Sequence, residues 1–144
     1  MIYFVKYFKN MGVIVITWDE KFKIGNELID SQHKNLFELI ESINDKYFLN
    51  KDELDNILGF LKEYTLEHFY YEERLLDELA CNDTEKHKRQ HDAFKDKVKL
   101  LEDRHDKEVN DLIDSEALEE LSDYLYNWLA NHIMVEDMKI KKYL

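Results

Sequence analysis

The sequence predicts an all-α protein, an up-down-up-down four-helix bundle with an N-terminal arm. The 144 residues include no proline and three glycines, and Leu, Glu, Lys and Asp are abundant, which favours long helices. Apolar residues also recur at helical spacing in four segments with short connections between them, and short connections make neighbouring helices antiparallel. This length suits one domain, so we expect the arm at residues 1–25 and the bundle at residues 26–144.

The first two helices are predicted from apolar stripes and one capping signal. The first runs from about residue 26 to about residue 45, on a stripe of Leu28, Ile29, Leu36, Phe37, Ile40 and Ile43. Asn50 with Glu53 three residues later resembles a capping box, which predicts the start of the second helix. That helix should reach about residue 79, on a stripe of Leu54, Ile57, Leu58, Leu61, Leu66, Phe69, Leu75, Leu76 and Leu79.

The last two helices follow polar breaks in the pattern. The segment 82–84 (Asn-Asp-Thr) can cap a third helix, whose apolar face of Phe94, Val98 and Leu101 continues toward Arg104. The charged stretch 105–115 indicates a connection. Ser115 then precedes a fourth stripe formed by Leu118, Leu121, Leu125, Trp128, Leu129 and Ile133.

Charge and composition limit the possible partners and location. Acidic residues outnumber basic ones 32 to 20, so a nucleic acid would be repelled. Cys81 is the only cysteine, which excludes an intrachain disulfide and favours the cytoplasm. The apolar segment 1–18 is interrupted by Lys6 and Lys9, so we expect an arm packed on the bundle and no membrane attachment; Met11 could equally be the start.

The six histidines are His33, His68, His87, His91, His105 and His132, and five of them fall in the predicted helices, with at least one on each. His87 and His91 are four residues apart, so their imidazoles project from one helix face and can bind one ion. His68 and Glu72 have the same spacing. If the apolar stripes face inward, these two pairs converge with His33 and His132 at a common depth in the bundle.

Asp137 follows His132 by five residues, which is not an ideal same-face spacing, so spacing alone leaves its role undecided. A ligand role would need a local widening of the helix, such as a π-type turn. Five imidazoles and two carboxylates would suit two first-row divalent ions, with iron or zinc as the leading candidates. A mononuclear zinc hydrolase fits poorly, because the stretch HKRQH lacks the glutamate of HExxH.

Four stretches carry a resemblance to a known family: WDEKFKIGNELIDSQHKNLF, HFYYEERLL, HKRQHDAF and NWLANHIMVEDMKIKKY. In this order they resemble the hemerythrin family, including its single-domain bacterial members, from residue 18 to residue 143. The resemblance implies a non-haem di-iron site with an oxo or hydroxo bridge. In that site one iron is held by His33 and His68, the other by His87, His91 and His132, while Glu72 and Asp137 bridge the two.

The resemblance also implies an apolar oxygen pocket that excludes water, formed by Leu36, Phe69, Trp128, Leu129 and Ile133. Without it, helical spacing predicts only that these five residues belong to the core. The segment ELACNDTEK, just before His87, replaces the family's usual Gly-Tyr-Pro-like turn, which puts the geometry of that connection in question. His105 matches no ligand position, and we expect both His105 and the acid Glu73 to be solvated.

The function implied by the resemblance is reversible binding of O2, for storage or for delivery to oxygen-requiring enzymes. We expect no catalytic residues and no enzymatic activity, and the sequence names no protein partner. Two alternatives remain open at this point. One is a module that senses oxygen or redox state, and the other is a di-iron enzyme such as a peroxidase or a nitric oxide-handling enzyme.

Overall fold

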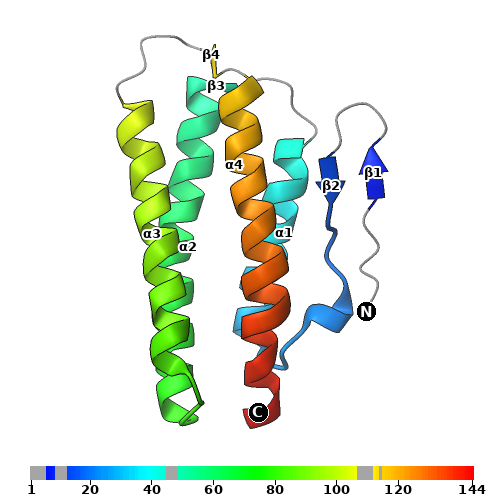
Figure 1. The fold of residues 1–144 in the computed structure, drawn as a ribbon, viewed down its shortest axis with the longest axis vertical. Helices are drawn as coiled ribbons and strands as arrows, with labels where there is room; N and C mark the ends of the chain where they lie inside the picture. The colour runs from blue at the N-terminus through cyan, green and yellow to red at the C-terminus, as the bar shows by residue number, and fades with distance from the viewer. Residues whose placement is uncertain (1–5, 9–12, 45–48, 107–111, 114) are drawn as a thin grey trace.

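A computed structural model describes residues 6–8, 13–44, 49–106, 112–113 and 115–144. The predicted four-helix bundle is confirmed: the long helices lie side by side and alternate in direction (Figure 1). The last helix continues into a π-helical segment, η2, and a 3-10 segment, η3, toward the C-terminus. The bounds are α1 Glu27–Asn44, α2 Lys51–Glu78, α3 Thr84–His105, α4 Ser115–Trp128, η2 Leu129–Glu136 and η3 Asp137–Tyr143.

Short strands accompany the bundle, and the sequence did not predict them because two or three residues are too few to show an alternating pattern. Strands β1 (Lys6–Phe8) and β2 (Val13–Val15) form an antiparallel hairpin beside α1 (Figure 1). Strand β3 (Leu49–Asn50) pairs with β4 (Leu112–Ile113) at the far end of the bundle from the C-terminus.

The described part of the arm contacts α1 through aromatic rings. A short 3-10 helix, η1 (Glu20–Phe22), follows the hairpin, and the Trp18 ring lies 6.2 Å from Phe22 and 5.3 Å from Phe37, centroid to centroid. The division between arm and bundle at residue 25 stays a prediction. Among the described helices, none has both the length and the apolar character needed to cross a bilayer.

Side-chain caps set the starts of the first two helices. The capping box of α2 is confirmed, because Asn50 Oδ1 accepts from the Glu53 N–H at 2.8 Å and Glu53 Oε2 accepts from the Asn50 N–H at 3.0 Å. At α1, Asn26 Oδ1 accepts from the Ile29 N–H at 3.1 Å. Asp30 accepts from the backbone N–H groups of Ile24 and Gly25, which fixes the chain's entry into α1.

The turn between α2 and α3, where the sequence departs from the family pattern, is a tight Schellman-type ending. The N–H of Cys81 donates to the Leu76 carbonyl and the N–H of Ala80 donates to the Asp77 carbonyl. Ala80 has φ 49° and Asp83 has φ 60°, so two residues other than glycine occupy the left-handed region. The turn therefore forms without the expected Gly-Tyr-Pro pattern.

Two apolar clusters fill the bundle, and the polar ligand candidates lie between them along the helices. On α1, His33 lies between Ile29 of the smaller cluster and Leu36 of the larger one. The smaller cluster consists of Ile24, Ile29, Leu76 and Ile140. The larger cluster includes Leu36, Tyr64, Phe69, Phe94, Trp128, Leu129 and Ile133. Leu28 and Leu66 were predicted as core but are exposed. Leu66 lies two residues from the inward-facing His68, about 200° around the helix, so it faces away from the core.

Candidate metal centre

The structure brings all seven residues of the proposed ligand set together in the centre of the bundle. Their ligand atoms form two groups that share two carboxylates, and within each group these atoms lie within 4.8 Å of one another. All seven residues are buried, with at most 6% of any of them exposed. One group is Glu72, His87, His91, His132 and Asp137, and the other is His33, His68, Glu72 and Asp137.

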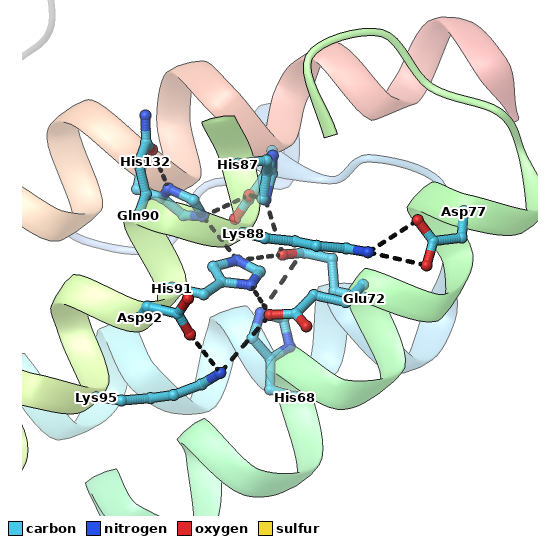
Figure 2. A network of polar contacts seen from close by, with 12 residues as sticks. His68, Glu72, Asp77, His87, Lys88, Gln90, His91, Asp92, Lys95 and His132 are labelled. Carbon is cyan, nitrogen blue, oxygen red and sulfur yellow. Dashed lines mark hydrogen bonds and ion pairs between the residues drawn. The ribbon is translucent and has the colours of Figure 1, made fainter. Parts of the chain in front are cut away.

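Each shared carboxylate turns one oxygen toward each histidine group. Glu72 Oε2 lies 3.0 Å from His91 Nε2 and 3.2 Å from His87 Nε2. Its Oε1 lies 3.9 Å from His68 Nε2, on the other side (Figure 2). Asp137 Oδ1 lies 2.9 Å from His132 Nε2, while Asp137 Oδ2 lies 3.1 Å from His33 Nε2. Both carboxylates therefore span the two groups.

The π-helical segment η2 explains how Asp137 reaches the site. The backbone N–H of Asp137 donates to the His132 carbonyl, five residues back, as in a π-helix. This wider turn places two residues five apart on the same face. The wider turn that a ligand role for Asp137 would need is thus present between His132 and Asp137.

Three ligand histidines are held by acceptors that the sequence analysis missed or placed wrongly. His68 Nδ1 lies 2.7 Å from Gln32 Oε1. His132 Nδ1 lies 2.6 Å from Gln90 Oε1 (Figure 2). His91 Nδ1 lies 2.9 Å from Glu73 Oε1, so the expectation that Glu73 is a solvated acid was wrong. Because each partner atom is an acceptor, each ring carries a proton on Nδ1, and its Nε2 faces the centre of the site, where a metal can bind it.

His105 is also not solvated, which corrects the expectation from sequence. It is 4% exposed, in the last turn of α3, and its Nε2 donates to Asp55 Oδ1 at 2.8 Å. The sequence placed it in a charged connection because the apolar pattern fades before it. The structure shows that it joins the end of α3 to the first turns of α2, away from the metal site.

The five predicted pocket residues are all buried and belong to the larger apolar cluster: Leu36, Phe69, Trp128, Leu129 and Ile133. Two of them cover the histidines of the three-histidine group. The Phe69 ring stacks on His91 and the Trp128 ring stacks on His132, each at a centroid distance of 3.9 Å. On the other side, the Tyr64 ring stacks on His68 at 4.5 Å.

Burial and charge act on the histidines in opposite directions. Burial lowers the pKa of His68 to about 3, against a smaller opposing effect of Glu72. Burial also disfavours the charged form of His87, but contacts with Asp137 and Glu72 outweigh it and raise its pKa to about 10. The pKa of His91 is raised as well, because contacts with Glu72 and Glu73 outweigh its burial.

The two carboxylates stay ionised in spite of their burial. Burial and the neighbouring Asp137 charge oppose ionisation of Glu72, but contacts with His68, His87 and His91 hold its pKa below the usual range. Burial opposes ionisation of Asp137 too, yet its histidine contacts hold its pKa well below normal. The site therefore keeps two buried negative charges, which a bound cation would neutralise.

Several of these ligand atoms lie close to one another but make no well-aligned hydrogen bond with any of the described residues. They are His33 Nε2, His68 Nε2, Glu72 Oε1 and both carboxylate oxygens of Asp137. Buried polar atoms are nearly always paired, so unpaired ones that converge on one centre call for a ligand. Nitrogen and carboxylate oxygen donors suit a first-row transition metal, and the residues present therefore fit a non-haem metal site.

Comparison with known proteins agrees with this geometry. Residues 24–144 match the family model described as the hemerythrin HHE cation binding domain. The chain is 30% identical to a bacteriohemerythrin of Clostridium acetobutylicum over 128 residues, covering 85% of this chain and 96% of that protein. It is 31% identical to a hemerythrin-like protein of Naegleria gruberi, covering 86% and 89%, and 28% identical to a bacteriohemerythrin of Pseudomonas aeruginosa, covering 85% and 76%.

The fold and the buried site thus define a helical-bundle protein with a non-haem metal centre. The chain belongs to the hemerythrin family.

Proposed function

We propose that this protein binds molecular oxygen reversibly at a non-haem di-iron centre, for storage or delivery and without enzymatic turnover. The observation that carries the proposal is the position of Glu72 and Asp137, each with one oxygen toward either histidine group. A carboxylate placed in this way is suited to join two ions. One ion would need only one of the two groups.

The two groups differ by one protein donor, and this difference indicates which of the two ions would bind an external ligand. His87, His91 and His132 with the two carboxylates offer five donors, while His33 and His68 with the same carboxylates offer four. We assign the open coordination position to the two-histidine side, because a metal that binds an external ligand keeps a position free. Two ferrous ions held there would supply the electrons that dioxygen accepts, which zinc cannot do.

The chain's own part in this function is to fix the donors and to keep water away. Gln32, Glu73 and Gln90 hold three rings with Nε2 facing inward. The apolar layer that includes Leu36 and Phe69 limits the access of water and acid. We place the function in the cytoplasm, which the single cysteine of the sequence supports.

Iron content in a matched pair of variants tests the di-iron proposal. His91 and His105 both lie on α3 and are both buried, but only His91 belongs to the ligand groups. We expect two irons per chain in the wild type and in His105→Ala, and a loss of iron in His91→Ala. Native protein with one zinc and no iron would refute the proposal.

An optical cycle separates a carrier from the two alternatives. Iron-loaded protein is transferred from anaerobic buffer to air and back, and its visible spectrum is recorded at each step. A spectral change that reverses on degassing supports oxygen binding. Sustained oxygen consumption with an added reductant would indicate an enzyme instead, and a partner protein retained in only one state would indicate a sensor.

A further inference from the structure

One layer of the bundle lies directly above the site, on the side of the larger apolar cluster. Leu36 and Phe94 follow the ligands His33 and His91 by three residues. Tyr64 and Trp128 precede the ligands His68 and His132 by four residues, on helices that run the other way. In an antiparallel bundle these offsets bring the four side chains to one level, and all four belong to the larger apolar cluster.

Two polar groups lie in this apolar layer, the Tyr64 hydroxyl and the Trp128 indole nitrogen, and both are buried without a well-aligned hydrogen-bond partner among the described residues. The Trp128 N–H lies close enough to the Tyr64 oxygen to favour its charged form, so the oxygen can accept from Trp128 while the Tyr64 hydrogen has no acceptor. Tyr64 is 6% exposed and Trp128 is 8% exposed, so both are shielded from bulk water. The nearby hydroxyl of Thr65 shows the usual outcome, because it donates to the Lys62 carbonyl at 2.8 Å.

The ring contacts place this polar pair over both halves of the site. Tyr64 stacks on His68 of the two-histidine group, with an angle of 18° between the rings. Trp128 stacks on His132 of the three-histidine group, with an angle of 13°. The Phe69 ring lies near both, at 5.3 Å from Tyr64 and 5.7 Å from Trp128, and supplies no hydrogen bond. Tyr64 is therefore the hydroxyl donor of this layer on the side with the open position.

We propose that the Tyr64 hydroxyl, with the Trp128 N–H beside it, donates a hydrogen bond to the outer atom of a small ligand held on the His33 and His68 side. The inference rests on the proposed di-iron site. It makes Tyr64 a specificity-determining residue, since ligands whose outer atom accepts a hydrogen bond gain affinity and ligands without such an atom do not. Dioxygen and small linear anions belong to the favoured class.

The test compares Tyr64→Phe with a matched control, Tyr124→Phe. Tyr124 is a half-buried tyrosine on α4 whose ring lies 5.7 Å from Phe94, and it stacks on none of the ligand histidines. Azide serves as the probe on ferric-loaded protein, with its dissociation constant read from an optical titration. We expect roughly tenfold weaker azide binding in Tyr64→Phe, as for the loss of one hydrogen bond to a charged ligand, and no change in Tyr124→Phe.

A second measurement needs no metal. Because the Tyr64 hydrogen has no acceptor in the folded chain, Tyr64→Phe should leave metal-free protein about as stable to denaturant as the wild type. A clear loss of stability would mean that the hydroxyl hydrogen has a structural acceptor and would overturn the inference. Equal azide binding in wild type and Tyr64→Phe, each with two irons, would overturn it too. Absence of iron from the wild type would refute the proposed function itself, so iron is measured first.

Discussion

The metal-free protein should lose stability as the pH rises from 6.5 toward 10, and His87 is the main cause. Its ordinary pKa is 6.5, and contacts with Asp137 and Glu72 outweigh its burial and raise the pKa in the folded protein to about 10. Between these two values the folded chain keeps a proton that the unfolded chain has released. The resulting stabilisation is complete below pH 6.5 and is lost as the pH rises through about 10.

The size of this effect follows from proton linkage. A difference of one bound proton changes the free energy of unfolding by about 1.4 kcal/mol per pH unit. Going from pH 7 to pH 9 should therefore cost metal-free protein roughly 2 kcal/mol through His87 alone. His91, whose pKa is also raised, acts in the same direction.

On the acid side the sign is reversed, and other groups are responsible. Burial lowers the pKa of His68 to about 3, so from pH 6.5 downward the unfolded chain binds a proton that the folded chain does not. Its full contribution to stability is thus present above pH 6.5 and is lost as the pH falls toward 3. Glu72 and Asp137, whose pKa values are lowered, lose their contributions at still lower pH. Metal-free protein should be most stable near pH 6.5.

The assay is denaturant unfolding of chelator-treated protein at several pH values from 5 to 9.5, read by circular dichroism. The matched control is His87→Asn, which keeps a polar side chain but cannot bind the proton, and its curve should be flatter above pH 6.5. Wild-type stability that stays constant between pH 6.5 and 9 would refute the reasoning. In metal-loaded protein the slope should disappear, because a metal binds the neutral ring in place of the proton.

Three further changes test other parts of the site. His105→Ala should destabilise the protein by about 1–3 kcal/mol in denaturant unfolding, because a buried hydrogen-bonded ring is lost; an unchanged midpoint would contradict this. Glu73→Ala should weaken iron binding roughly 10- to 100-fold in chelator competition, because His91 loses its Nδ1 acceptor; equal affinity would mean that the contact does not orient the ring. Leu36→Asn should keep its iron but lose its reversible optical change faster in air, because a polar side chain that admits water replaces a buried apolar one beside His33. If the optical change lasted equally long in the wild type and in Leu36→Asn, this would count against an apolar layer that excludes water.

Much of the fold could be predicted because the apolar period and the capping residues are local signals. The start of α2 at Asn50 follows from two residues three positions apart, and the structure has both hydrogen bonds. The hairpin of the arm was not predictable, because the residues of β1 and β2 are too few to form a pattern. Leu66 was misplaced because apolar character alone does not say which of two adjacent residues faces inward.

The convergence of His33, His68, His87, His91 and His132 was predictable because an α-helix relates spacing to direction. Asp137 was not predictable in this way, because five residues on an α-helix correspond to about 500°, which leaves the two side chains about 140° apart. Only the π-type hydrogen bond from the Asp137 N–H to the His132 carbonyl brings them to one face. Resemblance suggested this residue where spacing left it open, and the structure supplies the physical reason.

The acceptors that hold the histidine rings share a pattern that links one helix to the next, and spacing rules within a single helix do not predict it. Gln32, Glu73 and Gln90 each adjoin a ligand in sequence, namely His33, Glu72 and His91. Each nevertheless holds a ligand on a neighbouring element: Gln32 on α1 holds His68 on α2, Glu73 on α2 holds His91 on α3, and Gln90 on α3 holds His132 on η2.

Helix geometry accounts for this arrangement. When a ligand points at the bundle axis, the residue just before or just after it is turned by about 100° to one side and so faces an adjacent helix at their contact. From there a Gln or Glu side chain is long enough to reach the outer nitrogen of a ring that the adjacent helix directs inward. In a four-helix metal site, the residues adjacent to each ligand are therefore where its neighbours' supporting acceptors belong. An acid such as Glu73, which looks solvated beside Glu72 in the sequence, gains its role only from the helix packed against it.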